Sequence, residues 1–291
     1  MNASGSGRAR PAPRGGSGNV SDPHLSQTEE ALQREIAQRL TRLNGPGELR
    51  AALLAMVRTR GSTRELQAWR EHTQGLANAE AVRADIGALA PDARLPWFEV
   101  LVDRLKDHPA GDRRGLVEAA RNVMAADGKV RPRDRLLWLA LRHRLGEAPA
   151  DPLSGSSGND FSNLDDATTL AIATFTAFLA RLVPEASDEV AIGVAGQQWY
   201  AAALVACLPE ERRPALAPPD GDAMLRALRL VQGLSWMLRP VLVRAWVDAA
   251  FARSTPPARD ASDALRLACR LLESPMPPAL VGQYIEPAIH G

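Results

Sequence analysis

Residues 116–145 read LVEAARNVMAADGKVRPRDRLLWLALRHRL, and this stretch decides the fold that the sequence predicts. In its first part, apolar residues recur at the three-and-four spacing of an amphipathic helix: Leu116, Ala119, Ala120, Val123 and Met124. The second part repeats the pattern with Leu136, Leu137, Ala140, Leu141 and Leu145. Between them, Gly128 can adopt the left-handed conformation that closes a helix, and Pro132 suits the first position of the next one. The stretch therefore predicts a helical hairpin with one shared apolar face.

The composition of the whole chain favours helices over strands. Of its 291 residues, 45% are hydrophobic but only 4% are aromatic. Val and Ile nowhere alternate with polar residues over the length of a convincing strand. Two domains of ordinary size fit this chain length. We therefore expect an all-α protein made of two domains of helix-turn-helix repeats.

The distribution of Gly, Ser, Pro and Arg predicts where these domains begin and end. Residues 1–23 are expected to form a disordered N-terminal arm, because nothing in them can offset the entropy of ordering. Residues 149–163, with their Gly-Ser-Ser-Gly core, are expected to be a flexible linker. This leaves a helical domain with an acidic turn at 24–148, a second helical domain at 164–282, and a tail at 283–291.

Caps and helix breakers predict the other helices. In the first half, we expect a helix capped by Ser26, helices at 48–60 and 79–89, a helix capped by Ser62, and an apolar helix opened by Pro96. In the second half we expect helices near 164–182, 187–208, 222–238, 240–252 and 260–273. The segments that end at Leu145 and Leu272 resemble two weak copies of one helical unit.

Charge and targeting features point to the cytoplasm and to a protein partner. The net charge is only +1, so we expect no binding to nucleic acid or to an anionic membrane surface. The N-terminus lacks the apolar region of a secretory signal. Residues 190–208 carry no charge, but their Gly and Gln residues favour a buried helix over a membrane span. Any association with membranes is therefore expected to occur only through a partner.

Three short motifs carry a resemblance to a known family. They are Leu95-Pro96-Trp97-Phe98-Glu99, the run AADGKV at 125–130, and Ser274-Pro275-Met276-Pro277-Pro278. They resemble the C-terminal soluble helical accessory region of bacterial CAAX-prenyl-protease-like zinc metallopeptidases, and the acidic turn is similar to that of tellurite-resistance-B-like helical domains. The resemblance covers the chain loosely from His24 to Leu280. It implies an accessory region without the peptidase domain, because the zinc-binding His-Glu-x-x-His motif is missing from the sequence.

Asp127 and Asp134 are the candidate metal ligands. Two carboxylates on either side of a turn can converge, and the tellurite-resistance-B-like resemblance implies cation binding at this turn. Between them, however, lie Lys129, Arg131 and Arg133, whereas a calcium loop has oxygen ligands at alternating positions. Helix capping and a local ion pair are therefore the preferred interpretation, and a divalent cation is the alternative. We expect no other cofactor.

The sequence favours a non-enzymatic function. It contains no recognisable catalytic motif, and its five histidines are scattered. We expect a helical interaction or scaffold protein that presents grooves to a protein partner, with Trp97, Trp138 and Trp236 as possible contacts. The alternative is a divalent-cation-binding regulatory domain. An all-α enzyme with a dispersed active site is the least favoured hypothesis.

Overall fold

The computed structural model describes residues 23–146, 160–186, 191–253 and 255–288. Within these ranges the chain forms 13 α-helices and two short 3-10 helices, and no strand. The predicted all-α class is therefore confirmed. The N-terminal arm expected at 1–23 falls almost entirely outside the described residues, as does most of the linker expected at 149–163.

The first half of the chain wraps around one central helix. Its helices are α1 (Pro23–Thr41), α2 (Pro46–Val57), α3 (Thr63–His72), α4 (Ala79–Ala88), α5 (Pro91–Lys106), α6 (Ala110–Ala125) and α7 (Pro132–Arg144). Every residue of α2 from Ala51 to Val57 is buried, because the sequence AALLAMV has no polar face. Helix α2 contacts α3, α4, α5 and α6, so it forms the centre of this half.

The second half is built from pairs of helices. They are α8 (Asp166–Leu179), α9 (Val194–Val205), α10 (Gly221–Gln232), α11 (Leu238–Phe251), α12 (Arg259–Leu271) and α13 (Pro278–Val281), with the 3-10 helices η1 (Phe161–Asn163) and η2 (Glu210–Arg212). Helix α8 packs on α10, and α9 packs on α11. Helix α11 in turn contacts α12. The helix expected at 187–208 thus begins only at Val194, and the one expected at 222–238 already ends at Gln232.

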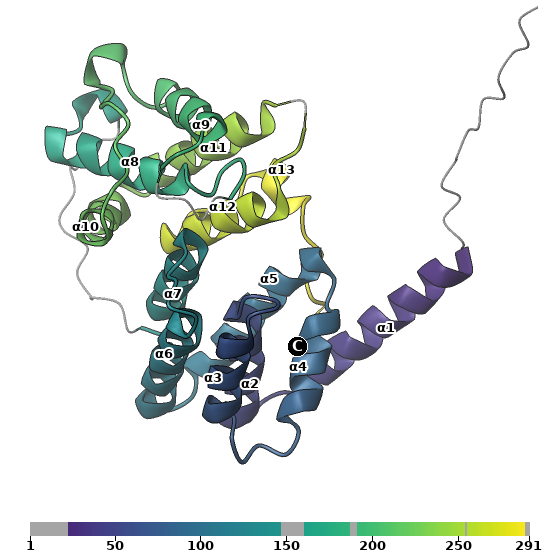
Figure 1. Ribbon diagram of the computed structural model, residues 1–291. Helices are drawn as coiled ribbons and strands as arrows, with labels where there is room; N and C mark the ends of the chain where they lie inside the picture. The colour runs from purple at the N-terminus through teal and green to yellow at the C-terminus, as the bar shows by residue number, and fades with distance from the viewer. Residues whose placement is uncertain (1–22, 147–159, 187–190, 254, 289–291) are drawn as a thin grey trace, which may run out of the picture.

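Helix α12 joins the two halves. It contacts α11 on one side and α5 and α7 on the other, and Figure 1 shows it lying between the upper and the lower part of the molecule. Nine of its residues are buried, including the charged residue Arg266. One hydrophobic cluster contains buried residues of both halves. The interface is therefore part of the core.

Two predicted helix starts are wrong. Helix α1 already begins at Pro23, so Ser26 lies inside it instead of capping it. Helix α5 begins at Pro91, and Pro96 lies within the helix instead of opening it. The sequence offers two prolines that suit a first position, and the earlier one takes that role.

Because of Pro96, the backbone carbonyl of Asp92 is left to accept a hydrogen bond from the C-terminal segment. In an α-helix the N–H of residue 96 would donate to the carbonyl of Asp92, but proline has no N–H. The backbone N–H of Ile285 donates to this carbonyl instead, at 3.3 Å. The residues that follow α13, expected to form a tail, are thereby bonded to the first half of the chain.

No helix in the described part of the chain is long and apolar enough to cross a membrane. Helices α8 and α9, which come from the least polar stretch of the sequence, instead contribute buried residues to the core. Examples are Phe175 and Phe178 in α8 and Trp199 in α9.

Candidate functional site

The turn between α6 and α7 has the predicted backbone. Gly128 has φ +80°, the left-handed conformation that glycine accepts without strain. Asp127 Oδ1 accepts a hydrogen bond from the backbone N–H of Lys129 at 2.9 Å. Asp134 Oδ2 accepts one from the backbone N–H of Arg131 at 3.0 Å and so caps the start of α7. Both aspartates therefore stabilise the hairpin.

Three carboxylates surround the guanidinium group of Arg131. It lies 2.5 Å from Asp127 Oδ2, 3.6 Å from Asp134 Oδ2 and 3.4 Å from Oε1 of Glu65. Glu65 comes from α3 and is fully buried, and its other oxygen accepts a hydrogen bond from the backbone N–H of Thr59. Local spacing in the sequence carries no signal for this contact, because Glu65 and Arg131 are far apart along the chain.

The two aspartates have different electrostatic environments. Burial tends to raise the pKa of Asp127, but hydrogen bonds from Arg131 and from the Lys129 backbone outweigh it and lower the pKa. Burial dominates at Asp134 and raises its pKa to about 6. Among the described residues, no group of three or more His, Cys, Asp or Glu side chains is arranged to hold a metal ion. A cation at this turn would have to displace Arg131, and its binding stays a prediction.

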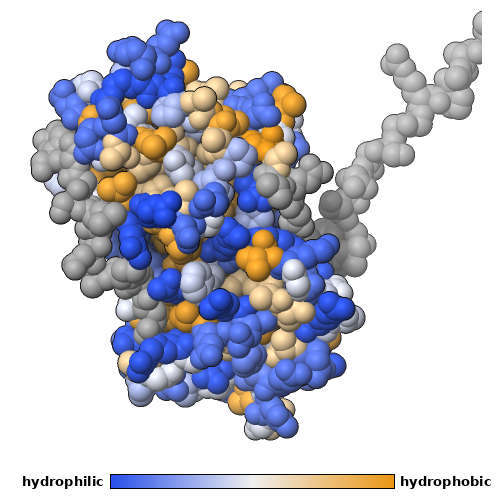
Figure 2. Space-filling model, turned by 60° about the vertical axis from the view of Figure 1, so that its left-hand side comes forward, coloured by the Kyte–Doolittle hydropathy of each residue, from blue (hydrophilic) through white to orange (hydrophobic). Residues whose placement is uncertain are grey.

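A groove runs between the α6–α7 hairpin and the start of α10. We call it the hairpin groove, and its volume is about 430 Å³. Its apolar lining is Met124, Ala125, Val130, Leu139, Met224 and Leu225; its other lining residues are Trp138, Gly221, Arg121, Asp134, Arg135 and Asp222. Figure 2 brings this side of the molecule forward and shows hydrophobic surface among hydrophilic residues at the waist between its two parts.

Trp138 stands at the junction of two hollows. Besides the hairpin groove, it lines a shallower hollow of about 440 Å³ together with Arg114, Val117, Glu118, Arg121 and Arg142. The guanidinium carbon of Arg142 lies 4.6 Å from the centre of the indole ring, a cation–π contact. Because Trp138 and Arg121 belong to both hollows, the two form one continuous surface along α6 and α7.

The three tryptophans expected to contact a partner differ in their exposure and in their position in the structure. Trp97 is only 3% exposed, so this part of the prediction is corrected: its large apolar ring is packed in the core of the first half. Trp236 is 79% exposed and lies just before α11, next to the exposed residues Met237 and Val241. Only Trp138 lines the hairpin groove.

A buried ion-pair network fastens α12 to α5. Arg266 of α12 has no exposed side-chain surface and donates to both carboxylate oxygens of Glu99, at 3.1 and 2.8 Å. Arg270 donates to the same carboxylate, and Glu286 accepts two hydrogen bonds from Arg266. Burial tends to raise the pKa of Glu99, but the hydrogen bonds from both arginines outweigh it and lower the pKa. The network is structural, and no pattern in the sequence predicts it.

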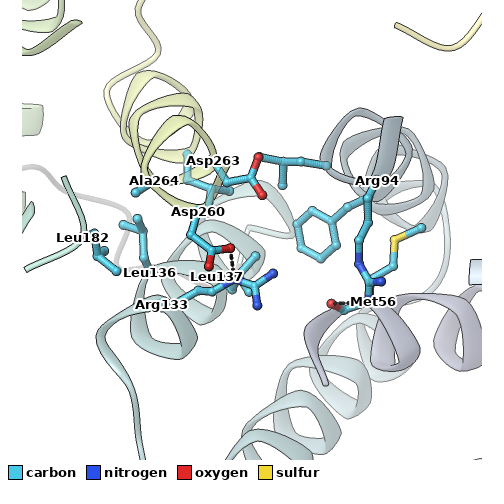
Figure 3. Close-up of a pocket in the computed structure, with 12 residues that line it drawn as sticks. Met56, Arg94, Arg133, Leu136, Leu137, Leu182, Asp260, Asp263 and Ala264 are labelled. Atoms are coloured by element: carbon cyan, nitrogen blue, oxygen red, sulfur yellow. Dashed lines mark hydrogen bonds and ion pairs between the residues drawn. The ribbon is translucent and has the colours of Figure 1, made fainter. Parts of the chain in front are cut away.

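A small cavity lies beside this network, between α5, α7 and α12 (Figure 3). Its volume of about 20 Å³ holds little more than one water molecule. Arg94 lines it and donates to the carbonyls of Ala55 and Met56, so its charge stabilises the C-terminal end of α2. Asp263 lines it too and accepts a hydrogen bond from the Tyr284 hydroxyl at 3.0 Å. This cavity is too small for a substrate.

The two cysteine thiols have low reactivity as nucleophiles. Cys207 and Cys269 are both buried, and burial raises the pKa of each to about 12. A reactive cysteine needs the opposite shift, because the thiolate is the nucleophile.

The chain was compared with models of known protein families, with curated proteins and with solved structures, and none of them matches it.

Proposed function

We propose that this protein is a non-enzymatic helical interaction protein, and that it binds a segment of a partner protein in the hairpin groove. The observation that carries the proposal is the groove itself: about 430 Å³ of hollow with an apolar lining, a half-buried tryptophan and a charged rim. Protein interfaces commonly combine such an apolar centre with a polar rim, and tryptophan and arginine are enriched among the residues that contribute most to binding.

The walls of the groove suit the binding of a peptide segment. Two of them are the helices of the α6–α7 hairpin, whose relative position is fixed by the capped turn. Val130 at the edge of the groove is 54% exposed, so a partner can bury apolar surface there. Preformed walls of this kind reduce the entropic cost of binding.

The chemistry of the described residues supports binding over catalysis. Both thiols are buried with raised pKa values, and Asp134, which lines the groove, is used in capping α7 and in the ion pair with Arg131. On this proposal the protein works in the cytoplasm as an accessory helical protein of the type its motifs resemble, built from two helical repeat units. It would reach a membrane only through its partner.

Site-specific photo-crosslinking in cells of the source organism tests the proposal. A photoreactive amino acid would replace Val130 in the groove or, as a control, Val205, which is 58% exposed on α9. We expect a discrete adduct from position 130 that is lost when Trp138→Ala is added, and no such adduct from position 205. Equal patterns from both positions, or adducts that ignore Trp138→Ala, would refute the proposal.

A further inference from the structure

We infer that residues 283–286 occupy a peptide-binding site formed by α5 and α12, and that the same segment of a second copy of the chain can fill this site by exchange. In Figure 1 the yellow segment that follows α13 runs down beside α5. None of the described residues that contact residues 283–286 lines the hairpin groove, so this inference goes beyond the proposed function and is independent of it.

Two hydrogen bonds fix the backbone of this segment. Arg259 of α12 donates to the carbonyl of Gln283 at 2.8 Å. The N–H of Ile285 donates to the carbonyl of Asp92 in α5 at 3.3 Å. The segment therefore bridges the two helices through its backbone. Main-chain hydrogen bonds together with pockets for alternate side chains are a common way in which proteins hold an extended peptide.

Two alternate side chains give the contact its chemical specificity. The ring of Tyr284 lies against two guanidinium groups of α12, 5.0 Å from that of Arg259 and 4.5 Å from that of Arg266. The hydroxyl of Tyr284 donates to Asp263 at 3.0 Å. Glu286 accepts two hydrogen bonds from Arg266, at 2.6 and 3.1 Å. The site therefore suits an aromatic residue that is followed two positions later by a carboxylate.

The C-terminal segment can leave without opening the ion pair beneath it. We call residues 278–288 the strap. After the strap has left, Arg266 still donates to both carboxylate oxygens of Glu99. Ile285 is 59% exposed already, so the buried side chains that release uncovers are chiefly Leu280 and Tyr284. The strap of a second copy would cover the same surface again with the same contacts.

The connection between α12 and α13 has the features of a hinge. Glu273 has φ +50° and is the only non-glycine residue with a positive φ in the described part of the chain. This conformation is unfavourable for a residue with a Cβ atom. The Glu273 side chain is 69% exposed, so its contacts with His143 and Arg239 offset little of the cost. Residues 274–278 read SPMPP, and proline favours an extended chain. Extension of this connection relieves Glu273 and carries the strap to a second copy.

A fluorescent peptide of residues 278–288 tests whether the site binds this segment from outside. The full chain would be used as wild type and as a strap variant with Leu280→Ala, Tyr284→Ala and Glu286→Ala, which weakens the chain's own strap and leaves the site unaltered. Thermal unfolding verifies that the variant is folded, and Tyr284→Ala plus Glu286→Ala replaces it if the triple change unfolds the chain.

We expect the peptide to bind the strap variant roughly tenfold or more tightly than the wild type, measured by fluorescence anisotropy. The reason is that the wild-type strap competes from within the chain at an effective concentration of about millimolar order. The same peptide with Tyr284→Ala is the matched control and should not bind. No binding to the folded strap variant, or equal binding to both proteins, would overturn the inference.

A mixture of two defective copies tests the exchange. The site variant, Arg259→Glu, keeps an intact strap but loses the guanidinium that contacts Gln283 and Tyr284. Native mass spectrometry should show a 1:1 dimer of the site variant with the strap variant. The matched control is the strap variant with Arg259→Glu added, which should form no dimer with the site variant. Peptide binding without the mixed dimer, or a dimer that persists in the control, would overturn exchange between copies.

Discussion

Arg266 and Glu99 are 167 residues apart in the sequence and form a two-pronged ion pair inside the protein. Arg266 is fully buried, so its charge depends on this partner and on Glu286. Loss of one partner of such an ion pair destabilises the fold, because it leaves a charge without compensation in the interior. The contribution of this pair to the packing of α12 on α5 can be measured as a change in the free energy of unfolding.

Removal of the charge of Glu99 should destabilise the whole protein. We expect Glu99→Gln to lower the free energy of unfolding by about 3 kcal/mol, because Arg266 and Arg270 lose their shared carboxylate. Chemical denaturation monitored by circular dichroism measures this change. Asp103→Asn is the control on the same helix: this exposed carboxylate pairs with Lys106 and Arg144, and its loss should cost less than about 1 kcal/mol. Equal effects of both changes would show that the buried pair has no special role.

The carboxyl of Asp263 should make stability depend on pH. Burial raises the pKa of Asp263 to about 6, whereas an aspartate in an unfolded chain has a pKa of about 4. The folded state therefore holds this proton more tightly, so Asp263 favours folding below about pH 4 and this contribution is lost as the pH rises to about 6. Asp263→Asn should remove the effect, so the variant should gain about 1–2 kcal/mol relative to wild type between pH 4 and pH 6.5. Denaturation at a series of pH values measures the difference; a constant difference would contradict the raised pKa.

The acidic turn should depend on Arg131 and not on a divalent cation. Because Arg131 already pairs with Asp127 and Glu65, we expect Mg²⁺ or Ca²⁺ to leave the melting temperature of wild type and of Asp127→Asn unchanged. Arg131→Ala should lower the free energy of unfolding by about 3 kcal/mol, because Glu65 stays buried without its cationic partner. A cation-dependent increase in the wild type that Asp127→Asn abolishes would instead support a cation-binding regulatory role.

Gly196 should tolerate no side chain. A Cβ atom at this position of α9 would lie 2.1 Å from the carbonyl oxygen of Ala180 and 2.9 Å from the Ile192 side chain. We expect Gly196→Ala to cost about 3 kcal/mol or more, measured by thermal unfolding. Gly87→Ala is the matched control, because a Cβ there in α4 meets nothing within 4 Å. Alanine is the better helix former, so this change should stabilise the protein by about 0.5–1 kcal/mol. Similar effects of the two substitutions would refute the close approach of α9 to Ala180.

Substitutions of a buried and of an exposed tryptophan should change the free energy of unfolding by very different amounts. Trp97→Ala should destabilise the protein by about 3–5 kcal/mol, because it leaves a large cavity between packed helices. Trp236→Ala should change stability by less than about 0.5 kcal/mol, since its ring is mostly in solvent. Denaturation curves of the two variants measure both values. A large loss from Trp236→Ala would mean that this exposed tryptophan packs on the protein in solution.

The parts of the structure that the sequence predicted are those determined by neighbouring residues. The hairpin, the positive φ of Gly128 and the capping position of Asp134 all follow from residue types within a few positions of one another. The missed parts are long-range. Neither the approach of Glu65 to Arg131 nor that of Arg266 to Glu99 can be read from helical periodicity, because periodicity tells which face of a helix is buried but not which helix covers it. The hairpin groove was missed for the same reason, since α10 supplies one of its walls.

The position of α12 has a consequence for synthesis on the ribosome. The helices of the first half emerge early and are rich in local contacts, so they can form while translation continues. The ion pair between Glu99 and Arg266, however, can form only after Arg266 has left the exit tunnel. The hydrogen bond from the Ile285 N–H to the Asp92 carbonyl likewise forms only after Ile285 has left it. Until then the nascent chain exposes the apolar surfaces of α5 and α7 that α12 later covers, and this interval is when the chain is most open to chaperones and to aggregation.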